Sequence, residues 1–274
     1  MSGWLPGASC TPGTCVEPAG SVVAAPRAVL RLTAVAVLLL AGTAVVLTPL
    51  GRRCVPDALV RRWSRWIVRA AGVRVRLTGS AAPEGGLLLV ANHVSWLDIP
   101  LLAAVRPARM LAKSEIGRWP AAGVLAARGG VLFIERDRLR ALPDTVAVLA
   151  RALRSGAAVA AFPEGSTWCG RAQGPFRRAV FQAALDARVP VQRVRIRYLA
   201  GGPAVSTTPA FVGADTLPAS LWRVASARAL TAEVEVCPPV PPDRRHDRRS
   251  LAEAVGHRAH GHQGKAPSKS MCVL

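Results

Sequence analysis

The sequence predicts an α/β protein with a mostly parallel sheet flanked by helices and an N-terminal membrane anchor. Three observations lead to this prediction. Short apolar runs, typical of buried strands, alternate with longer helical patterns through the middle of the chain. Parallel strands need crossover connections, and helices between the strands supply them. An uncharged apolar stretch of helical length also lies near the N-terminus.

The membrane anchor is predicted over residues 27–51. Leu32–Leu50 carries no charge and approaches the ~20 residues that cross a bilayer. A cleaved signal peptide is the alternative, although the stretch starts late and exceeds the usual apolar region of about 7–15 residues. Arginines gather after the stretch, within residues 52–69. The positive-inside rule therefore places the following domain on the cytoplasmic side of the cell membrane.

Residues 52–72 are predicted to form an interfacial amphipathic helix. Trp63 and Trp66 recur with aliphatic residues at helical spacing, and arginines lie largely between them. Tryptophans favour the headgroup level of a membrane, and arginines favour anionic phosphates. A helix that packs its tryptophans on the following domain fits the same pattern. Both alternatives keep that domain close to lipid.

The central domain is predicted over residues 73–237. Its candidate strands, in chain order, are Val73–Leu77, Leu87–Ala91, Met110–Ala112, Val131–Ile134, Ala157–Phe162, Val191–Leu199 and Thr231–Cys237. Its candidate helices are Leu97–Val105, Leu139–Arg154 and Phe176–Ala187. Residues 1–26 are expected to be poorly ordered, and residues 238–274 to form a basic, disordered tail.

The composition restricts the partners of this chain. Its 36 basic and 16 acidic residues give a formal net charge of +20, which attracts nucleic acid, anionic lipid surfaces or phosphorylated cofactors. The apolar N-terminal stretch argues against nucleic acid. The six cysteines include no Cys-x-x-Cys pair, which favours a reduced cytoplasmic setting, and we expect no metal site.

A histidine and an aspartate follow the strand candidate Leu87–Ala91, in the run Asn92-His93-Val94-Ser95-Trp96-Leu97-Asp98. A carboxylate that accepts one ring N–H of a histidine fixes its tautomer and stabilises the imidazolium that forms when the other nitrogen takes a proton. The spacing therefore predicts a general base, His93, with Asp98 as its partner. A structural histidine beside an aspartate is the alternative.

Two further segments follow strand candidates at the same predicted sheet edge. Arg136 comes just after Val131–Ile134 and offers a fork of donors that fits a phosphate. The turn Glu164-Gly165-Ser166-Thr167 comes after Ala157–Phe162 and offers backbone N–H groups and two hydroxyls. In open α/β sheets, ligands bind beyond the carboxyl ends of the strands. We therefore expect both segments to lie beside His93.

Together these residues resemble the lysophospholipid (glycerophospholipid) acyltransferases, most closely the bacterial 1-acylglycerol-3-phosphate acyltransferases, over residues 75–200. Four motifs match in order: Asn92, His93 and Asp98; Gly130, Phe133, Ile134 and Arg136; Phe162 through Ser166; and Val189-Pro190-Val191. Two positions depart from the family pattern. Thr167-Trp168 replaces an arginine common in the third motif, and Arg193 stands where the fourth often has a proline. These departures affect the substrate detail that we expect, and not the chemistry.

The resemblance implies an acyltransferase domain that moves an acyl chain from an acyl thioester to the free hydroxyl of lysophosphatidic acid (1-acylglycerol-3-phosphate). The product is phosphatidic acid, and the donor is acyl-CoA or acyl carrier protein. His93 would take the hydroxyl proton while Asp98 orients the ring. No bound cofactor is implied, and the expected partners are membrane lipids, the acceptor and the donor.

The resemblance also implies where the acceptor binds. Arg136 and the turn Glu164, Gly165, Ser166 and Thr167 would hold its phosphate and glycerol, a positioning role that supplies much of the rate. Lys113 matches a lysine common after the first motif and is a further candidate for phosphate contact. A solvated surface charge is the alternative for Lys113.

Other functions remain possible at this stage. The same chemistry on another lyso-lipid, such as lyso-ornithine lipid, is poorly separated by the motifs. A serine hydrolase is disfavoured because no Gly-x-Ser-x-Gly elbow is present. A non-enzymatic basic membrane adaptor would explain the charge and the anchor, but it leaves His93, Asp98 and Arg136 without a purpose.

Overall fold

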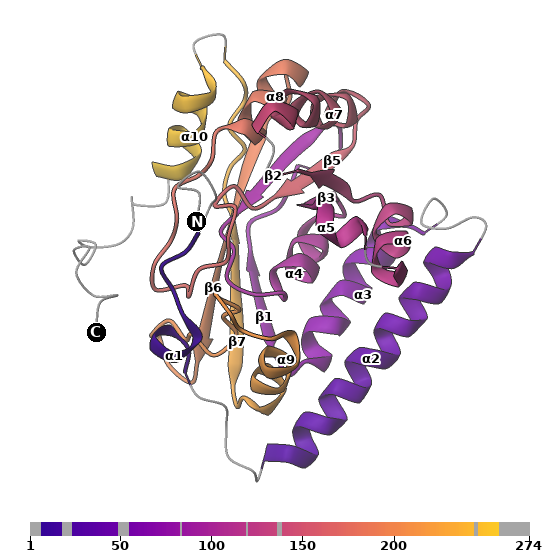
Figure 1. Ribbon diagram of the computed structural model, residues 1–274, viewed down its shortest axis with the longest axis vertical. Helices are drawn as coiled ribbons and strands as arrows, with labels where there is room; N and C mark the ends of the chain where they lie inside the picture. Colours follow the sequence, from indigo (N-terminus) through magenta and orange to yellow (C-terminus); the bar gives the residue numbers. More distant parts are fainter. Residues whose placement is uncertain are drawn as a thin grey trace.

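The computed structural model describes residues 7–17, 24–48, 55–82, 84–118, 120–135, 139–243 and 246–257 (Figure 1). Its strands are β1 (Arg74–Thr78), β2 (Leu87–Ala91), β3 (Arg109–Lys113), β4 (Leu132–Ile134), β5 (Ala158–Ala161), β6 (Val191–Ala200) and β7 (Leu230–Val236). They form one sheet of order β1-β7-β6-β2-β5-β3-β4, in which β6 and β7 are the antiparallel neighbours. The prediction of a mostly parallel sheet is confirmed, with strand bounds that differ by a few residues.

The sheet separates two apolar layers, and β2 supplies both because its side chains alternate between the faces. Leu87 and Leu89 belong to one layer, and Leu88 and Val90 to the other. The first layer includes residues of α3 (Asp57–Ala70), α4 (Asp98–Val105) and α9 (Leu217–Ser226). The second includes residues of α7 (Leu142–Arg154), α8 (Ala179–Ala187) and α10 (Arg248–His257). All five residues of β2 are buried, so the site at its end rests on a rigid strand.

All three helices predicted for the central domain are present, with changes at their ends. Leu97–Val105 corresponds to α4, and Leu139–Arg154 divides into a 3-10 turn, η3 (Leu139–Ala141), followed by α7. The third, α8, begins at Ala179 rather than Phe176. The prediction missed α9 and the two short helices α5 (Ser114–Gly117) and α6 (Pro120–Arg128).

The N-terminal apolar stretch forms α2 (Ala25–Leu47), which is long and apolar enough to cross a bilayer. Its mean hydropathy is 2.3, with 6% of its most apolar window buried, so it is a possible anchor. One side of α2 packs along α9, α3 and α6 (Figure 1). Arg27 and Arg31 donate to the carbonyl oxygens of Ser226, Ala225 and Ala227 at the end of α9. Cations are favourable there because a helix C-terminus is electronegative.

The tryptophan-bearing helix, α3, packs against α2 and α4. Trp63 approaches α2 so closely that a Cβ on Gly42 would lie 2.2 Å from its ring, which explains the glycine. Trp66 stays 40% exposed, with the Arg62 guanidinium 5.0 Å from its ring centre. The packing alternative placed the tryptophans on the following domain, whereas Trp63 packs on α2. An interfacial role for the exposed side of α3 stays a prediction.

Both ends of the chain carry structure where we expected little. Residues 7–17, which we call the N-terminal strap, contain α1 (Pro12–Cys15) and bury Cys10. In the expected tail, Val240 bridges to Val191 and α10 buries Leu251 and Val255. The expectation of disorder is therefore wrong for these described parts. A short apolar stripe among Pro, Arg and Gly residues was too weak a signal to predict docking.

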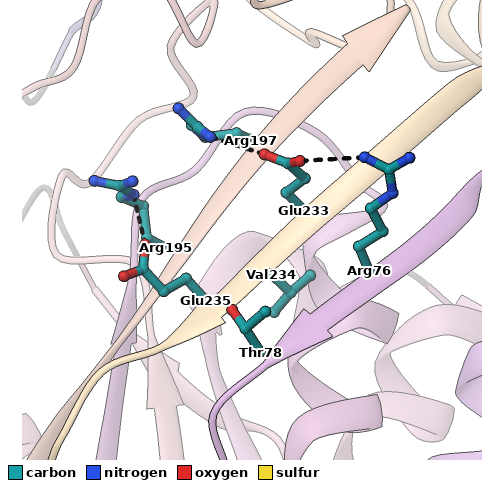
Figure 2. A pocket seen from close by; sticks show the side chains of 7 residues that line it. All are labelled: Arg76, Thr78, Arg195, Arg197, Glu233, Val234 and Glu235. Carbon is teal, nitrogen blue, oxygen red and sulfur yellow. Dashed lines mark hydrogen bonds and ion pairs between the residues drawn. The ribbon is translucent and has the colours of Figure 1, made fainter. Parts of the chain in front are cut away.

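The outer face of β1, β7 and β6 contains a hollow of about 220 Å³ that is lined by charged side chains (Figure 2). These charges pair with one another across the strands. Arg197 lies 2.8 Å and Arg76 3.6 Å from the two carboxylate oxygens of Glu233, and Arg195 lies 3.1 Å from Glu235. The charged side chains of this hollow are therefore paired with one another within the protein.

Candidate active site

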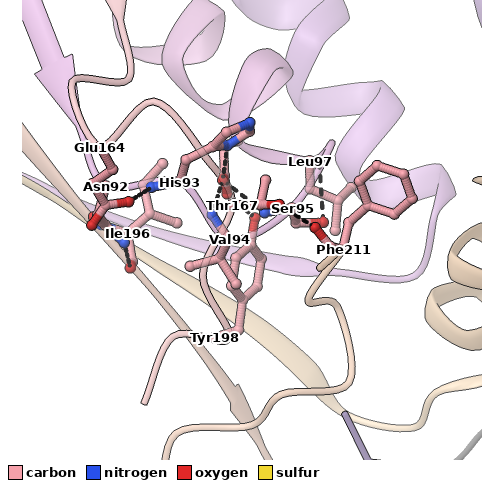
Figure 3. A network of polar contacts seen from close by, with 11 residues as sticks. Asn92, His93, Val94, Ser95, Leu97, Glu164, Thr167, Ile196, Tyr198 and Phe211 are labelled. Carbon is pink, nitrogen blue, oxygen red and sulfur yellow. Dashed lines mark hydrogen bonds and ion pairs between the residues drawn. The ribbon is translucent and has the colours of Figure 1, made fainter. Parts of the chain in front are cut away.

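His93 lies in a network of polar contacts beyond the carboxyl end of β2 (Figure 3). The structure brings it into direct contact with Asp98. His93 lies two residues beyond the strand, and Asp98 is the first residue of α4. The His93 Nδ1 atom is 2.9 Å from Asp98 Oδ2. A carboxylate only accepts hydrogen bonds, so Nδ1 carries the proton and Nε2 keeps its lone pair. Among the described residues, Nε2 has no hydrogen-bond partner.

Asp98 is fully buried and is held by three donors besides the histidine. The backbone N–H groups of Val94 and Ser95 donate to Oδ2 at 2.6 and 2.8 Å, and the Tyr198 hydroxyl donates to Oδ1 at 2.6 Å. Burial and the charge of Asp98 raise the pKa of Tyr198 well above its usual range, so the phenol stays a donor. This set of donors compensates the buried carboxylate and fixes its direction.

His93 is held from its other side by Phe162 and Glu164. The imidazole stacks on the Phe162 ring, with centroids 3.9 Å apart and planes 10° apart. The backbone N–H of His93 donates to Glu164 Oε2 at 2.8 Å. The His93 side chain remains 21% exposed, so a substrate hydroxyl can reach it. The ring is thus oriented by packing as well as by Asp98.

Glu164 has a different position from the one expected. It is 3% exposed, and its second oxygen accepts from the Gly174 N–H at 3.2 Å, so both oxygens bind backbone. Burial raises the pKa of Glu164 to about 8, although the two N–H donors favour the carboxylate. The side chain therefore faces the protein and not a ligand, and it joins the His93 loop (residues 92–97) to the turn after β5. These contacts indicate a positioning role for Glu164.

Further contacts fix the His93 loop to its neighbours. The Asn92 side chain donates to the Ile196 carbonyl and accepts from the Ile196 N–H, both at 2.9 Å. The Trp168 N–H donates to the His93 carbonyl at 2.8 Å. The Thr167 hydroxyl donates to the Phe211 carbonyl, so it is occupied within the protein rather than free for glycerol. The loop is therefore tied to β6 and to the segments around 168 and 211.

A cavity of about 560 Å³ opens beyond the carboxyl ends of β3, β4 and β5, beginning at the Phe162 ring that stacks on His93. Its apolar lining includes Leu111, Ile134, Leu142, Phe162 and Phe176. Its basic lining consists of Arg177, Arg178 and Arg248, which are exposed and have no ion-pair partner among the described residues. An apolar floor with unpaired arginines suits an amphipathic anion.

The other predicted site residues divide into three groups. Gly165 lines the cavity with a φ of +75°, and Ser166 is partly exposed beside it. The Lys113 side chain is 48% exposed and lies 3.5 Å from Glu115, which fits the alternative of a surface charge. Arg136 comes two residues after the end of β4 in the sequence and lies outside the described residues. Its role stays a prediction.

The departure at Arg193 has a structural explanation. Its guanidinium donates to the carbonyl oxygens of Val255 at 3.1 Å and Gly256 at 2.5 Å, and it lies 5.3 Å from the centre of the Phe176 ring. Arg193 therefore binds the end of α10 onto β6, as cations commonly do at helix C-termini. This also places Arg248, at the start of α10, on the cavity rim.

Sequence reasoning missed several residues that support or line the candidate site. Tyr198 is the only tyrosine of the chain and stands in a predicted strand, which was a usable signal. The adjacent Arg177 and Arg178 were visible as a basic pair before a helix. Arg248 had no usable signal, because its place depends on the docking of α10.

Comparisons with known proteins agree with this geometry. The family model described as Acyltransferase matches residues 72–197. A 1-acyl-sn-glycerol-3-phosphate acyltransferase of Neisseria gonorrhoeae is 38% identical over 162 residues, which are 58% of this chain and 63% of that protein. A lyso-ornithine lipid O-acyltransferase of Pseudomonas aeruginosa is 36% identical over 214 residues, 76% of this chain and 79% of that protein. The chain thus spans less than two thirds of the first relative.

A solved structure has the same fold. The crystal structure of the 1-acyl-sn-glycerophosphate (LPA) acyltransferase PlsC from Thermotoga maritima aligns with a TM-score of 0.55 at 17% identity. The alignment covers 89% of this chain and 99% of that one. At this identity the likeness supports the fold, including the mixed sheet with its flanking helices.

Proposed function

Because the chain belongs to the lysophospholipid acyltransferase family, we propose that it transfers an acyl chain from an acyl thioester to the free hydroxyl of a lyso-lipid, with His93 as general base. The observation that carries this proposal is the contact between His93 and Asp98, which leaves Nε2 free. The Phe162 ring that stacks on His93 also lines an amphipathic cavity. Lysophosphatidic acid is the acceptor that we propose first.

The proposed reaction needs one proton transfer and no covalent enzyme intermediate. His93 Nε2 takes the proton of the acceptor hydroxyl as its oxygen attacks the thioester carbonyl, and the imidazolium then protonates the leaving thiolate. Asp98, through Nδ1–H, stabilises the positive ring between these steps. Tyr198, Val94 and Ser95 keep Asp98 pointed at the ring. Trapping an acyl-serine or acyl-cysteine would contradict this scheme.

The charges around the cavity support a phosphorylated acceptor. A phosphomonoester carries nearly two negative charges, and guanidinium groups bind it through paired charge-assisted bonds. Arg177, Arg178 and Arg248 line the cavity without ion-pair partners among the described residues. Arg136, two residues after β4 in the sequence and outside the described residues, is a further candidate for this role. The apolar part of the cavity, which includes the side chains of Leu111 and Phe176, suits an acyl chain. Acyl-CoA or acyl carrier protein would be the donor.

A second acceptor, lyso-ornithine lipid, is favoured by one specific observation. The alignment with the Pseudomonas aeruginosa enzyme named for that acceptor covers 79% of the relative, compared with 63% for the Neisseria gonorrhoeae enzyme. Lyso-ornithine lipid is zwitterionic and lacks phosphate, so the unpaired arginines fit it less well. We therefore keep it as the alternative.

Attachment to the membrane is part of the proposal. The exposed apolar side chains of α2, among them Leu30, Val37 and Leu40, and the exposed Trp66 on α3 would contact lipid. The excess of arginine after α2 supports a cytoplasmic location for the catalytic domain. Lipid acceptors would then reach the site without leaving the membrane.

Incubation of membranes containing the protein with labelled acyl-CoA and a panel of lyso-lipids tests the acceptor. We expect labelled phosphatidic acid from lysophosphatidic acid, and none from membranes that carry the His93→Ala variant. Labelled ornithine lipid as the main product would select the alternative acceptor. Failure to label any lyso-lipid, with acyl carrier protein also supplied as donor, would overturn the proposed function.

A further inference from the structure

Three cysteines from distant parts of the chain lie together behind the His93 loop. Cys10 and Cys15 belong to the N-terminal strap, and Cys169 follows the turn after β5. Their sulfur atoms all lie within 4.8 Å of one another. Cys10 and Cys169 are each 1% exposed, whereas Cys15 is partly exposed. Two of the three thiols are thus enclosed, and the third, Cys15, can be reached from solvent.

The strap is held in place independently of the thiols. Its Glu17 carboxylate accepts hydrogen bonds from the Ser206 hydroxyl at 2.7 Å, the Thr208 hydroxyl at 2.8 Å and the Arg171 guanidinium at 2.8 Å. Although burial opposes it, these donors keep the pKa of Glu17 below its ordinary value. Two separate attachments of one segment indicate a built contact, so the thiols are not neighbours by chance.

We propose that Cys10, Cys15 and Cys169 bind one thiophilic metal ion of the zinc class, which joins the strap to the catalytic domain. Thiolate is the ligand type that zinc prefers in structural sites. A zinc–sulfur bond of about 2.3 Å in tetrahedral geometry places the sulfurs about 3.8 Å apart. Because the sulfurs already lie within 4.8 Å of one another, each pair needs to approach by about 1 Å at most to share one ion.

The number of thiols distinguishes metal binding from a disulfide. A disulfide joins two sulfurs and needs an external oxidant, and it leaves the third thiol without a role. Metal binding uses all three sulfurs and needs no oxidant, because each thiol releases one proton as its sulfur bonds to the ion. The accessible side of Cys15 leaves the fourth coordination position to a water molecule. The bound ion and three thiolates carry a net charge of minus one, which the basic chain tolerates.

The site would act on the catalytic machinery through the backbone. Cys169 directly follows Trp168, whose N–H donates to the His93 carbonyl at 2.8 Å. Gly170 comes next, and a Cβ there would lie 3.6 Å from Val94. An ion on Cys169 therefore restrains the segment that supports the His93 loop. The inference does not depend on which acceptor the enzyme uses.

Cobalt substitution of the full-length protein, purified under anaerobic reducing conditions, tests the site without an activity assay. Cobalt(II) bound by thiolates shows a strong sulfur-to-metal charge-transfer absorption, and tetrahedral coordination gives intense visible bands. We expect both from the wild-type protein, with zinc displacing cobalt at one equivalent per chain. The Cys15→Ser and Cys169→Ser variants should bind zinc more weakly by more than the roughly 10–100-fold that loss of a supporting partner costs.

The matched control is Cys237→Ser, because Cys237 is a partly buried thiol outside the cluster. This variant should retain the cobalt spectrum and the zinc stoichiometry. A wild-type protein without the charge-transfer absorption would overturn the proposal, and this result does not depend on whether any variant folds. Unchanged metal binding in Cys169→Ser would also overturn it, as would a Cys10–Cys169 disulfide found by peptide mapping of the freshly purified protein.

Discussion

The His93 site and the hollow on the β1, β7 and β6 face both contain charged side chains, but they use these charges differently. On the sheet face, Arg195 and Arg197 pair with the glutamates of β7 (Figure 2). At the site, Asp98 and Glu164 are buried and bind backbone N–H groups, while Arg177 and Arg178 stay unpaired among the described residues. The comparison shows that charged side chains indicate a binding site only where some of them have no partner within the protein and can bind a ligand.

The largest effect expected from this contrast is the loss of catalysis in His93→Ala. Removing the base should lower kcat by about 10²–10⁴-fold, the usual contribution of general-base catalysis. Steady-state transfer assays on the purified variant measure it, and circular dichroism shows whether the fold is kept. The control is Thr78→Ala in the charged hollow, which should leave kcat unchanged. Near-normal turnover by folded His93→Ala would remove His93 from the mechanism.

The next effect concerns the pH dependence of stability. The pKa of Glu164 rises from 4.5 to about 8 on folding, so the folded state binds more protons between these values. The free energy of unfolding therefore falls as pH rises from 4.5 to 8. The Glu164→Gln variant lacks this dependence on pH. The free energy of unfolding of wild type should therefore fall by a few kcal/mol relative to the variant between pH 4.5 and 8, at about 1.4 kcal/mol per pKa unit.

Urea unfolding at pH 5, 6.5 and 8 measures this difference between wild type and Glu164→Gln. Glu233→Gln is the matched control, because Glu233 lies in the ion pairs of the sheet face and should shift stability by less than about 1 kcal/mol. Parallel pH profiles for wild type and Glu164→Gln would show that Glu164 stays ionised in the folded protein.

The unpaired arginines should affect substrate binding rather than turnover. The double change Arg177→Ala and Arg178→Ala should raise the acceptor KM by roughly 10–100-fold, which corresponds to the lost charge-assisted hydrogen bonds of about 1.5–3 kcal/mol. The double change Arg195→Ala and Arg197→Ala removes the same formal charge from the sheet face and should leave KM unchanged. Kinetics with each substrate varied in turn separate the cases. A rise confined to the donor KM would assign these arginines to the donor.

The smallest effect expected is that of Tyr198→Phe, which removes one of the hydrogen bonds to Asp98. The free energy of unfolding should fall by about 1.5 kcal/mol, the low end of the range for a bond to a charged group, because three donors still hold the carboxylate. The pH–rate profile should shift as well, because Asp98 acts through His93. A loss of stability with no change in that profile would make Tyr198 a packing residue alone.

The sequence predicted the sheet well because its strands are continuous apolar runs. Leu87–Ala91 is buried on both faces, and such a run has little choice but a central strand. The contact between His93 and Asp98 was predictable for a related reason, since both lie in the short segment that follows this strand. Ends of the chain were harder, because Cys10 and Val255 become buried only by docking on surfaces made elsewhere.

The role of Glu164 could not be inferred from the sequence. A glutamate in a turn after a strand suggests a ligand contact, and only the fold shows that its oxygens face the N–H groups of His93 and Gly174. The grouping of the cavity arginines could not be inferred either. Arg248 lies in the same cavity lining as Arg177 and Arg178 because Arg193 attaches α10 to the sheet. Local patterns predict elements, whereas these roles depend on how the elements pack.

The grip of Arg27 and Arg31 on the end of α9 has a mechanical consequence for α2. Because α2 is attached to α9 at its beginning and packs on α3 and α6 farther along, it cannot move freely relative to the rest of the protein. If α2 lies in a bilayer, as we propose, this attachment also fixes the height and tilt of the proposed base, His93, relative to α2. Under that proposal, an acceptor hydroxyl would be acylated only if it reaches the depth of His93, however well its headgroup fits the site.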